Sequence, residues 1–142
     1  MKTTVLRDQD IVRKWLLVDA AGKPAGRLAV KLAALLRGRE RRDFSPHVDM
    51  GNFVVVINAA KVTLSGKKED QKLYKSYSGY PDGLKQIPAR EIRRTHPDRI
   101  IRQAVRGMLP KNKLSRRLLI RLKVHAGAEH PHAAQQPQPV KF

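Results

Sequence analysis

The sequence predicts an α/β fold in which parallel strands pack against helices. Two short apolar runs, residues 15–19 and 53–58, are rich in Val, Leu and Ile and are typical of buried strands. Leucines at helical spacing lie between them, after Pro24 and before Gly38. The order strand, helix, strand implies a right-handed parallel crossover.

The chain of 142 residues is long enough for one domain with one hydrophobic core. Residues 1–13 are polar with weak periodicity, which predicts an amino-terminal arm that is a tail or a docking segment. Residues 14–128 then form a single α/β domain. Residues 129–142 are rich in Pro and Gln and lack periodicity, so we expect an extended tail; the sequence leaves open whether it orders only with a partner.

A strongly amphipathic helix is expected before Pro110. The run T-H-P-D at residues 95–98 predicts a capping box with Thr95 as the cap. The apolar half of the helix is predicted to hold Ile100, Ile101, Ala104, Val105, Met108 and Leu109. The other expected elements are a short apolar run at 61–64, a polar loop at 65–70, an extended arm at 72–80, a short helix opened by Pro88, a helix capped by Asn112 and a strand at 122–125.

The charge balance makes nucleic acid the leading partner. Thirty Lys and Arg face twelve Asp and Glu, which gives a net charge of +18. Residues 99–123 hold nine of these cations and no acid. An anionic membrane is the competing partner, but the basic helix has no Trp or Phe on its apolar half. We therefore expect no membrane association.

Four basic clusters, at residues 37–42, 67–75, 90–94 and 99–123, favour binding to the phosphates of structured RNA. Any one such cluster is as often a solvated surface. Tyr74, Tyr77 and Tyr80 offer rings that stack on unpaired bases, unless they pack on the body of the protein. The sequence contains no helix-turn-helix, zinc-finger or RNP pattern, so it offers no typical DNA-binding motif.

An enzyme or a metal protein is the alternative class. The turn A-A-G-K-P-A-G-R lacks the glycine spacing of a dinucleotide site, and no P-loop occurs. Asp19 more often caps a turn than acts in catalysis, and His47 is expected to organise its loop through Asp49. His130 and His132 lie near His125, but no cysteine or H-E-x-x-H helix accompanies them. We expect no catalytic residue, metal, cofactor or small-molecule substrate.

The amino terminus carries charges where a signal peptide needs an apolar run, and no apolar stretch approaches membrane-spanning length. We therefore expect a cytoplasmic protein.

Specific strings then identify a family. F-S-P-H-V-D-M-G-N, V-I-N-A-A-K-V, S-G-K-K, Y-S-G-Y-P-D-G-L-K, G-M-L-P-K-N-K-L and K-V-H-A-G-A-E-H-P-H-A-A-Q-Q-P occur in this order. Over residues 15–137 the chain resembles bacterial ribosomal protein L-thirteen of the large subunit. The resemblance implies a three-layer α/β/α fold with a small, mostly parallel four-stranded sheet and extended basic loops and tails. It also implies binding to large-subunit (23S-type) ribosomal RNA and to neighbouring ribosomal proteins, and an early role in subunit assembly.

The string G-M-L-P-K-N-K-L, residues 107–114, matches a signature of this family. The resemblance implies that Lys111 and Lys113 lie at the RNA surface. The family usually has a Gly-Arg pair where this chain has Ser115 and Arg116, which puts a glycine-dependent backbone conformation in question. An RNA-binding regulator that acts on messenger RNA off the ribosome stays open as an alternative. The residues expected to contact RNA are Arg37, Arg39, Arg41, Arg42, His47, Lys67, Lys68, Lys72, Lys75, Tyr77, Tyr80, Lys85, Arg106, Lys111, Lys113, Arg116, Arg117, Arg121, His130 and His132.

Overall fold

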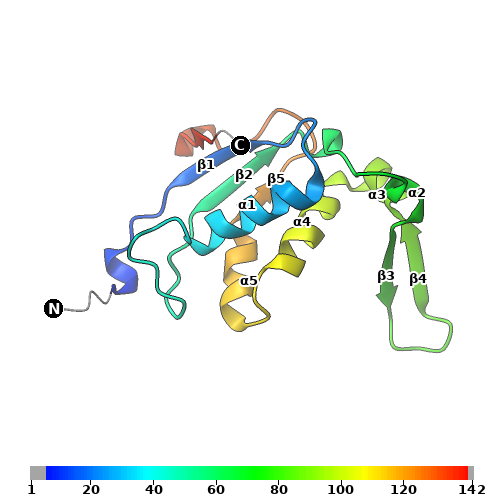
Figure 1. The fold of residues 1–142 in the computed structure, drawn as a ribbon, viewed down its shortest axis with the longest axis horizontal. Helices are drawn as coiled ribbons and strands as arrows, with labels where there is room; N and C mark the ends of the chain where they lie inside the picture. Colours follow the sequence, from blue (N-terminus) through cyan, green and yellow to red (C-terminus); the bar gives the residue numbers. More distant parts are fainter. Residues whose placement is uncertain (1–5, 141–142) are drawn as a thin grey trace.

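The computed structural model describes residues 6–140 and has the predicted α/β class (Figure 1). A four-stranded parallel sheet has the order β5-β2-β1-β6, and a separate antiparallel pair joins β3 to β4. The elements are η1 (Asp8–Asp10), β1 (Trp15–Asp19), α1 (Ala25–Arg37), β2 (Phe53–Ile57), η2 (Ala59–Lys61), α2 (Lys68–Gln71), β3 (Leu73–Tyr77), β4 (Leu84–Pro88), α3 (Ala89–Thr95), α4 (Pro97–Met108), α5 (Lys113–Ile120), β5 (Leu122–Val124), η3 (Ala133–Gln135) and β6 (Gln138–Pro139).

The unit β1-α1-β2 forms as predicted. Pro24 lies just before α1, and Gly38 ends it in the left-handed conformation with φ 71°. Gly38 also lies against the carbonyl of Met50, where a side chain would collide. On the sheet, Val54 and Val56 are fully buried in one core with the leucines of α1. This core holds the helices on one face of the sheet.

The amphipathic helix α4 packs beside α1 (Figure 1). The predicted apolar residues Ile100, Ile101, Val105 and Leu109 are buried, but Met108 is 41% exposed. The predicted capping box is wrong. Thr95 is the last residue of α3, where its hydroxyl donates to the carbonyl of Glu91, and His96 precedes α4.

The arm at residues 72–80 forms a hairpin that projects away from the α/β body (Figure 1). Residues 68–71, predicted as loop, form the short helix α2 at its base. Tyr74 is only 8% exposed and belongs to the main core, so the expectation that the whole arm lies outside the core is wrong at this residue. Tyr74 therefore anchors the hairpin.

The carboxy-terminal segment supplies the fourth strand. Leu16 and Leu17 of β1 pair in parallel with Gln138 and Pro139, and the amide of Val140 donates to the carbonyl of Leu17 at 2.9 Å. An edge position suits a strand that contains proline. This part of the tail thus pairs with the chain's own sheet, a contact that the sequence had left open. The predicted division at residue 128 stays a prediction.

The second face of the sheet carries aromatic rings. Trp15 and Phe53 stack with ring centroids 4.5 Å apart, and the ring of His132 lies 5.4 Å from Trp15. His132 directly precedes η3, so a helical turn of the tail covers the face opposite α1 and α4. This arrangement agrees with the predicted three-layer α/β/α fold.

The amino-terminal arm lies partly outside the described residues, at 1–5. Within its described part Ile11 is buried, so at least this residue packs on the body. Among the described residues, no helix has the length and apolar character needed to span a bilayer.

Candidate nucleic-acid interface

A groove of about 690 Å³ lies between the end of α4 and the start of α5. Four cationic side chains line it, and we call it the basic groove. It brings together predicted residues that are up to ten positions apart in the sequence: Arg106, Lys111, Lys113 and Arg116.

The turn that shapes the basic groove is held by two polar residues. Asn112 caps α5, because its side-chain oxygen accepts from the amide of Ser115 at 2.9 Å. Ser115 is buried. Its hydroxyl, the donor, lies within hydrogen-bond distance of two acceptors, the side-chain oxygen of Asn112 and the carbonyl of Pro110. Ser115 lies inside α5 and does not have a positive φ, so no glycine is needed there. The departure from the family motif therefore leaves the local fold intact.

Among the described residues, no carboxylate lines the basic groove. In residues 6–140, none of its four cations forms an ion pair with an acid, whereas Arg102 on α4 pairs with Asp98 at 3.7 Å. All four are exposed. Clustered cations without internal counter-charge attract a polyanion, and phosphate oxygens satisfy both their charge and their donors.

A second group of arginines is paired inside the protein with aspartates or with backbone carbonyls. We call these arginines and their acidic partners the loop cluster: Arg13, Arg41, Asp43, Asp49 and Arg121. Arg121 forms a two-pronged ion pair with Asp49, and their side chains are 14% and 8% exposed. Arg13 donates to the Asp49 carbonyl at 3.1 Å.

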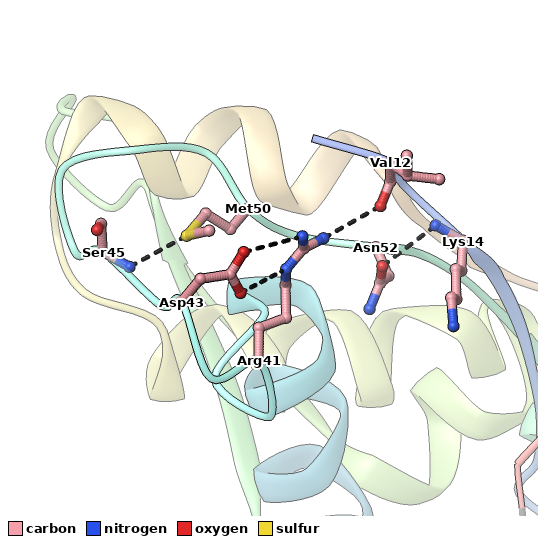
Figure 2. Close-up of polar contacts among 7 residues, drawn as sticks. All are labelled: Val12, Lys14, Arg41, Asp43, Ser45, Met50 and Asn52. Atoms are coloured by element: carbon pink, nitrogen blue, oxygen red, sulfur yellow. Dashed lines mark hydrogen bonds and ion pairs between the residues drawn. The ribbon is translucent and has the colours of Figure 1, made fainter. Parts of the chain in front are cut away.

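Figure 2 shows the other half of the loop cluster. Arg41 bonds Asp43 through two nitrogens, at 3.2 and 3.3 Å, and donates to the carbonyl of Val12 at 3.1 Å. Asn52 accepts from the amide of Lys14 at 3.2 Å, and the amide of Ser45 donates to the sulfur of Met50. These contacts tie the loop after α1 to the amino-terminal segment. Arg41 and Arg121, both predicted to contact RNA, are thus used to hold the fold.

Of the rest of the first predicted cluster, Arg37 lies next to the basic groove. Arg37 shares a small cavity of about 210 Å³ with Pro110 and Asn112, and its guanidinium lies 5.8 Å from the centre of the Phe44 ring. Arg39 and Arg42 are exposed on the adjoining loop. His47 is also exposed, but Asp49 pairs with Arg121, so the expected link between His47 and Asp49 is wrong.

The hairpin carries a separate set of candidates, far from α5 (Figure 1). Tyr77 and Tyr80 are 67% and 75% exposed, and Leu84, which pairs with Tyr77 across the strands, is 51% exposed. The ammonium of Lys72 lies 5.4 Å from the centre of the Tyr74 ring. The remaining predicted cations here are exposed: Lys67, Lys68, Lys75 and Lys85. The last predicted cation, Arg117, lies outside the hairpin and is exposed on α5.

His130 and His132 lie with His125 in a group of rings whose centroids are 5.5 to 6.4 Å apart. Burial, then the neighbouring His132 and His130, lower the pKa of His125. Among the described residues, no group of three or more His, Cys, Asp or Glu is arranged to hold a metal. His132 lies against Trp15 of the sheet, His130 lies beside His132, and neither lines the basic groove.

Asp19 caps a turn. It accepts from the amide of Ala21 at 3.0 Å and from the amide group of Asn58 at 2.9 Å, and these two bonds lower its pKa. The turn-capping interpretation of this residue is confirmed.

Sequence reasoning missed Gln103 and Gly107 as lining residues of the basic groove, and it treated Asn112 only as a cap. Helical spacing was the available signal, because Gln103, Arg106 and Gly107 share one side of α4.

Comparisons with known proteins identify the family of the chain. A family model described as "Ribosomal protein L13" matches residues 13–131. The chain is 55% identical to the large ribosomal subunit protein uL13 of Thermus thermophilus over 138 residues, 97% of each chain. It is 54% identical to uL13 of Clostridioides difficile over 142 residues, all of this chain and 99% of the relative. For uL13 of Thermotoga petrophila the identity is 51%, over 99% of this chain and 95% of the relative. The chain therefore belongs to the ribosomal protein L13 family.

Proposed function

We propose that this protein is a structural component of the large ribosomal subunit that binds large-subunit ribosomal RNA and acts early in assembly of the subunit. Its family consists of structural ribosomal proteins and not of enzymes. The relatives named above are large-subunit proteins. Placement in the ribosome means a cytoplasmic location in a bacterium.

The observation that carries the proposal is the basic groove. Arg106, Lys111, Lys113 and Arg116 face one concave surface that no acid lines. Each cation that neutralises a phosphate releases condensed counterions, so the groove binds the RNA backbone with a strong dependence on salt. Arg37 adjoins the groove through the small cavity that it shares with Pro110 and Asn112, and the exposed Arg39, Arg42 and Arg117 are further cations for the RNA backbone.

The β3–β4 hairpin provides a second contact with a different chemistry. Tyr77 and Tyr80 offer exposed rings for unpaired bases, and Lys75 and Lys85 reach the phosphates beside them. Two contacts that lie far apart on one folded chain bring distant RNA segments together (Figure 1). This bridging suits a protein that joins the subunit early, and it also leaves surface for neighbouring ribosomal proteins.

Sedimentation tests the proposal. The tagged full-length protein should travel with the large subunit through a sucrose gradient at moderate salt, and should be released only as salt is raised. Protein that stays at the top of the gradient while bound to messenger RNA would contradict a ribosomal role and favour the regulator. A sample treated with ribonuclease provides the control, because it should lose the association.

A further inference from the structure

A second groove, of about 770 Å³, lies on the other side of α4 from the basic groove, between α4, the start of α1 and the segment that leads to α2. We call it the α1–α4 groove. Its floor is apolar and consists of Leu64, Ile100, Ala104 and Met108. Its size falls within the range of small-molecule and nucleotide sites.

Met108 is the unusual residue of this floor. It lies on the apolar half of α4, whose other large residues are buried, and yet it is 41% exposed. A thioether is polarisable and makes favourable contacts with aromatic rings. The floor therefore offers a partly exposed apolar surface suited to a flat aromatic group.

Cations surround this floor. Arg27, Lys68 and Lys72 line the groove, and no acidic side chain does so. Two of them are held in place: Lys68 donates to the hydroxyl of Ser65 at 3.0 Å, and the Lys72 ammonium lies over the Tyr74 ring. The groove thus combines an apolar floor with a positively charged rim.

We propose that the α1–α4 groove binds one unpaired nucleotide of the RNA, with its base on the apolar floor and its phosphates on the cationic rim. This inference rests on the proposed function. A base within a duplex is stacked and cannot enter, so the nucleotide comes from a loop or a bulge. Side chains that line the groove, such as Gln71 and Thr63, supply hydrogen bonds for the edge of the base. A side chain of a neighbouring protein would use the floor alone and leave the three cations without counter-charge.

Gly26 allows the groove to be filled without disturbing the fold. It lies in the first turn of α1 and lines the groove, its φ is not positive, and a Cβ built on it meets nothing within 4 Å. Gly26→Leu places a helix-favouring side chain in the space that the base would take. Val30→Leu is the matched control, since Val30 is exposed on the same helix and does not line the groove.

The experiment is footprinting of a full-length large-subunit rRNA transcript with wild type, Gly26→Leu and Val30→Leu. Base-specific and 2′-hydroxyl reagents report unpaired nucleotides, and hydroxyl radicals report the backbone. The filled variant should lose protection at one or a few unpaired nucleotides, keep the backbone footprint and bind roughly tenfold more weakly, as expected for one lost stacked base. The control should match wild type.

An unchanged set of protected nucleotides in Gly26→Leu would overturn the inference, and so would loss of the entire footprint by the folded variant. If wild type itself leaves no footprint, the proposed function fails first. Cross-linking from Met108→benzoylphenylalanine in reconstituted large subunits identifies the occupant. Cross-links to rRNA support the inference, and cross-links to a protein neighbour overturn it.

Discussion

The loop cluster and the basic groove are both rich in cationic side chains, but those of the loop cluster stabilise the fold and those of the basic groove face solvent. In the loop cluster Arg121 and Arg41 are paired with Asp49 and Asp43, and Asp49 is nearly buried. The basic groove has no carboxylate, and its cations face solvent. The positions of the few acids therefore decide which cations stabilise the fold and which are available to RNA.

The largest expected effect is on stability, from the loop cluster. Arg121→Gln leaves the Asp49 carboxylate buried without its ion pair and should lower the free energy of unfolding by about 3 kcal/mol. Urea denaturation followed by circular dichroism measures the change. The double variant Asp49→Asn with Arg121→Gln should recover part of the loss, because no buried charge is then left unpaired. A single variant as stable as wild type would remove the distinction between the two regions.

Two substitutions of Asn112, which caps α5, distinguish the effect of the shape of the basic groove from the effect of its charge. Asn112→Ala removes the acceptor for the Ser115 amide and should lower the free energy of unfolding by about 1 kcal/mol. Asn112→Asp keeps that acceptor and should retain stability, but it adds a negative charge to the groove and should weaken RNA binding. Thermal melts and filter binding of both variants make the comparison. Equal RNA affinity of Asn112→Asp and wild type would mean that the RNA does not approach this turn.

Lowering the pH should weaken the stabilising contribution of the loop cluster and should not affect the basic groove. This is the smallest of the predicted effects. The hydrogen bonds from Arg41 hold the pKa of Asp43 below its ordinary value of 3.8. The stabilising contribution of Asp43 is thus complete above about pH 4 and disappears as the pH falls through its lowered pKa. Arg41→Gln should remove this part of the acid dependence, as measured by denaturation between pH 2.5 and 6. An acid dependence identical to wild type would assign it to other carboxyl groups, such as Asp19.

The sequence predicts the parts of the fold that depend on local signals. Pro24 and Gly38 mark the two ends of α1, Asn112 marks the start of α5, and the apolar runs mark β1, β2 and β5. Thr95 was misassigned because a threonine bonds equally well to a carbonyl at the end of one helix or to an amide at the start of the next. Strand β6 was missed because two residues of a Pro- and Gln-rich segment carry no periodicity.

The candidate interface could likewise be predicted only where its residues are close together in the sequence. Lys111 and Lys113 come from one sequence motif and both line the basic groove, so the motif alone picks out two of its four cations. Arg121 looked equivalent to them in the sequence, because its partner Asp49 is 72 positions away and only the folded chain brings the two together. Burial of Tyr74 likewise depends on packing across elements and not on the neighbouring residues.

The most direct test is the salt dependence of binding to large-subunit rRNA. In the variant Lys111→Gln, Lys113→Gln, Arg116→Gln, the slope of log K against log salt should fall by up to about three, at unchanged stability. The matched control, Arg7→Gln, Lys14→Gln, Lys61→Gln, removes the same charge from exposed positions outside the four basic clusters and should keep the wild-type slope. Equal slopes for the two triple variants would show that net charge and not the basic groove binds the RNA, and would contradict the central claim.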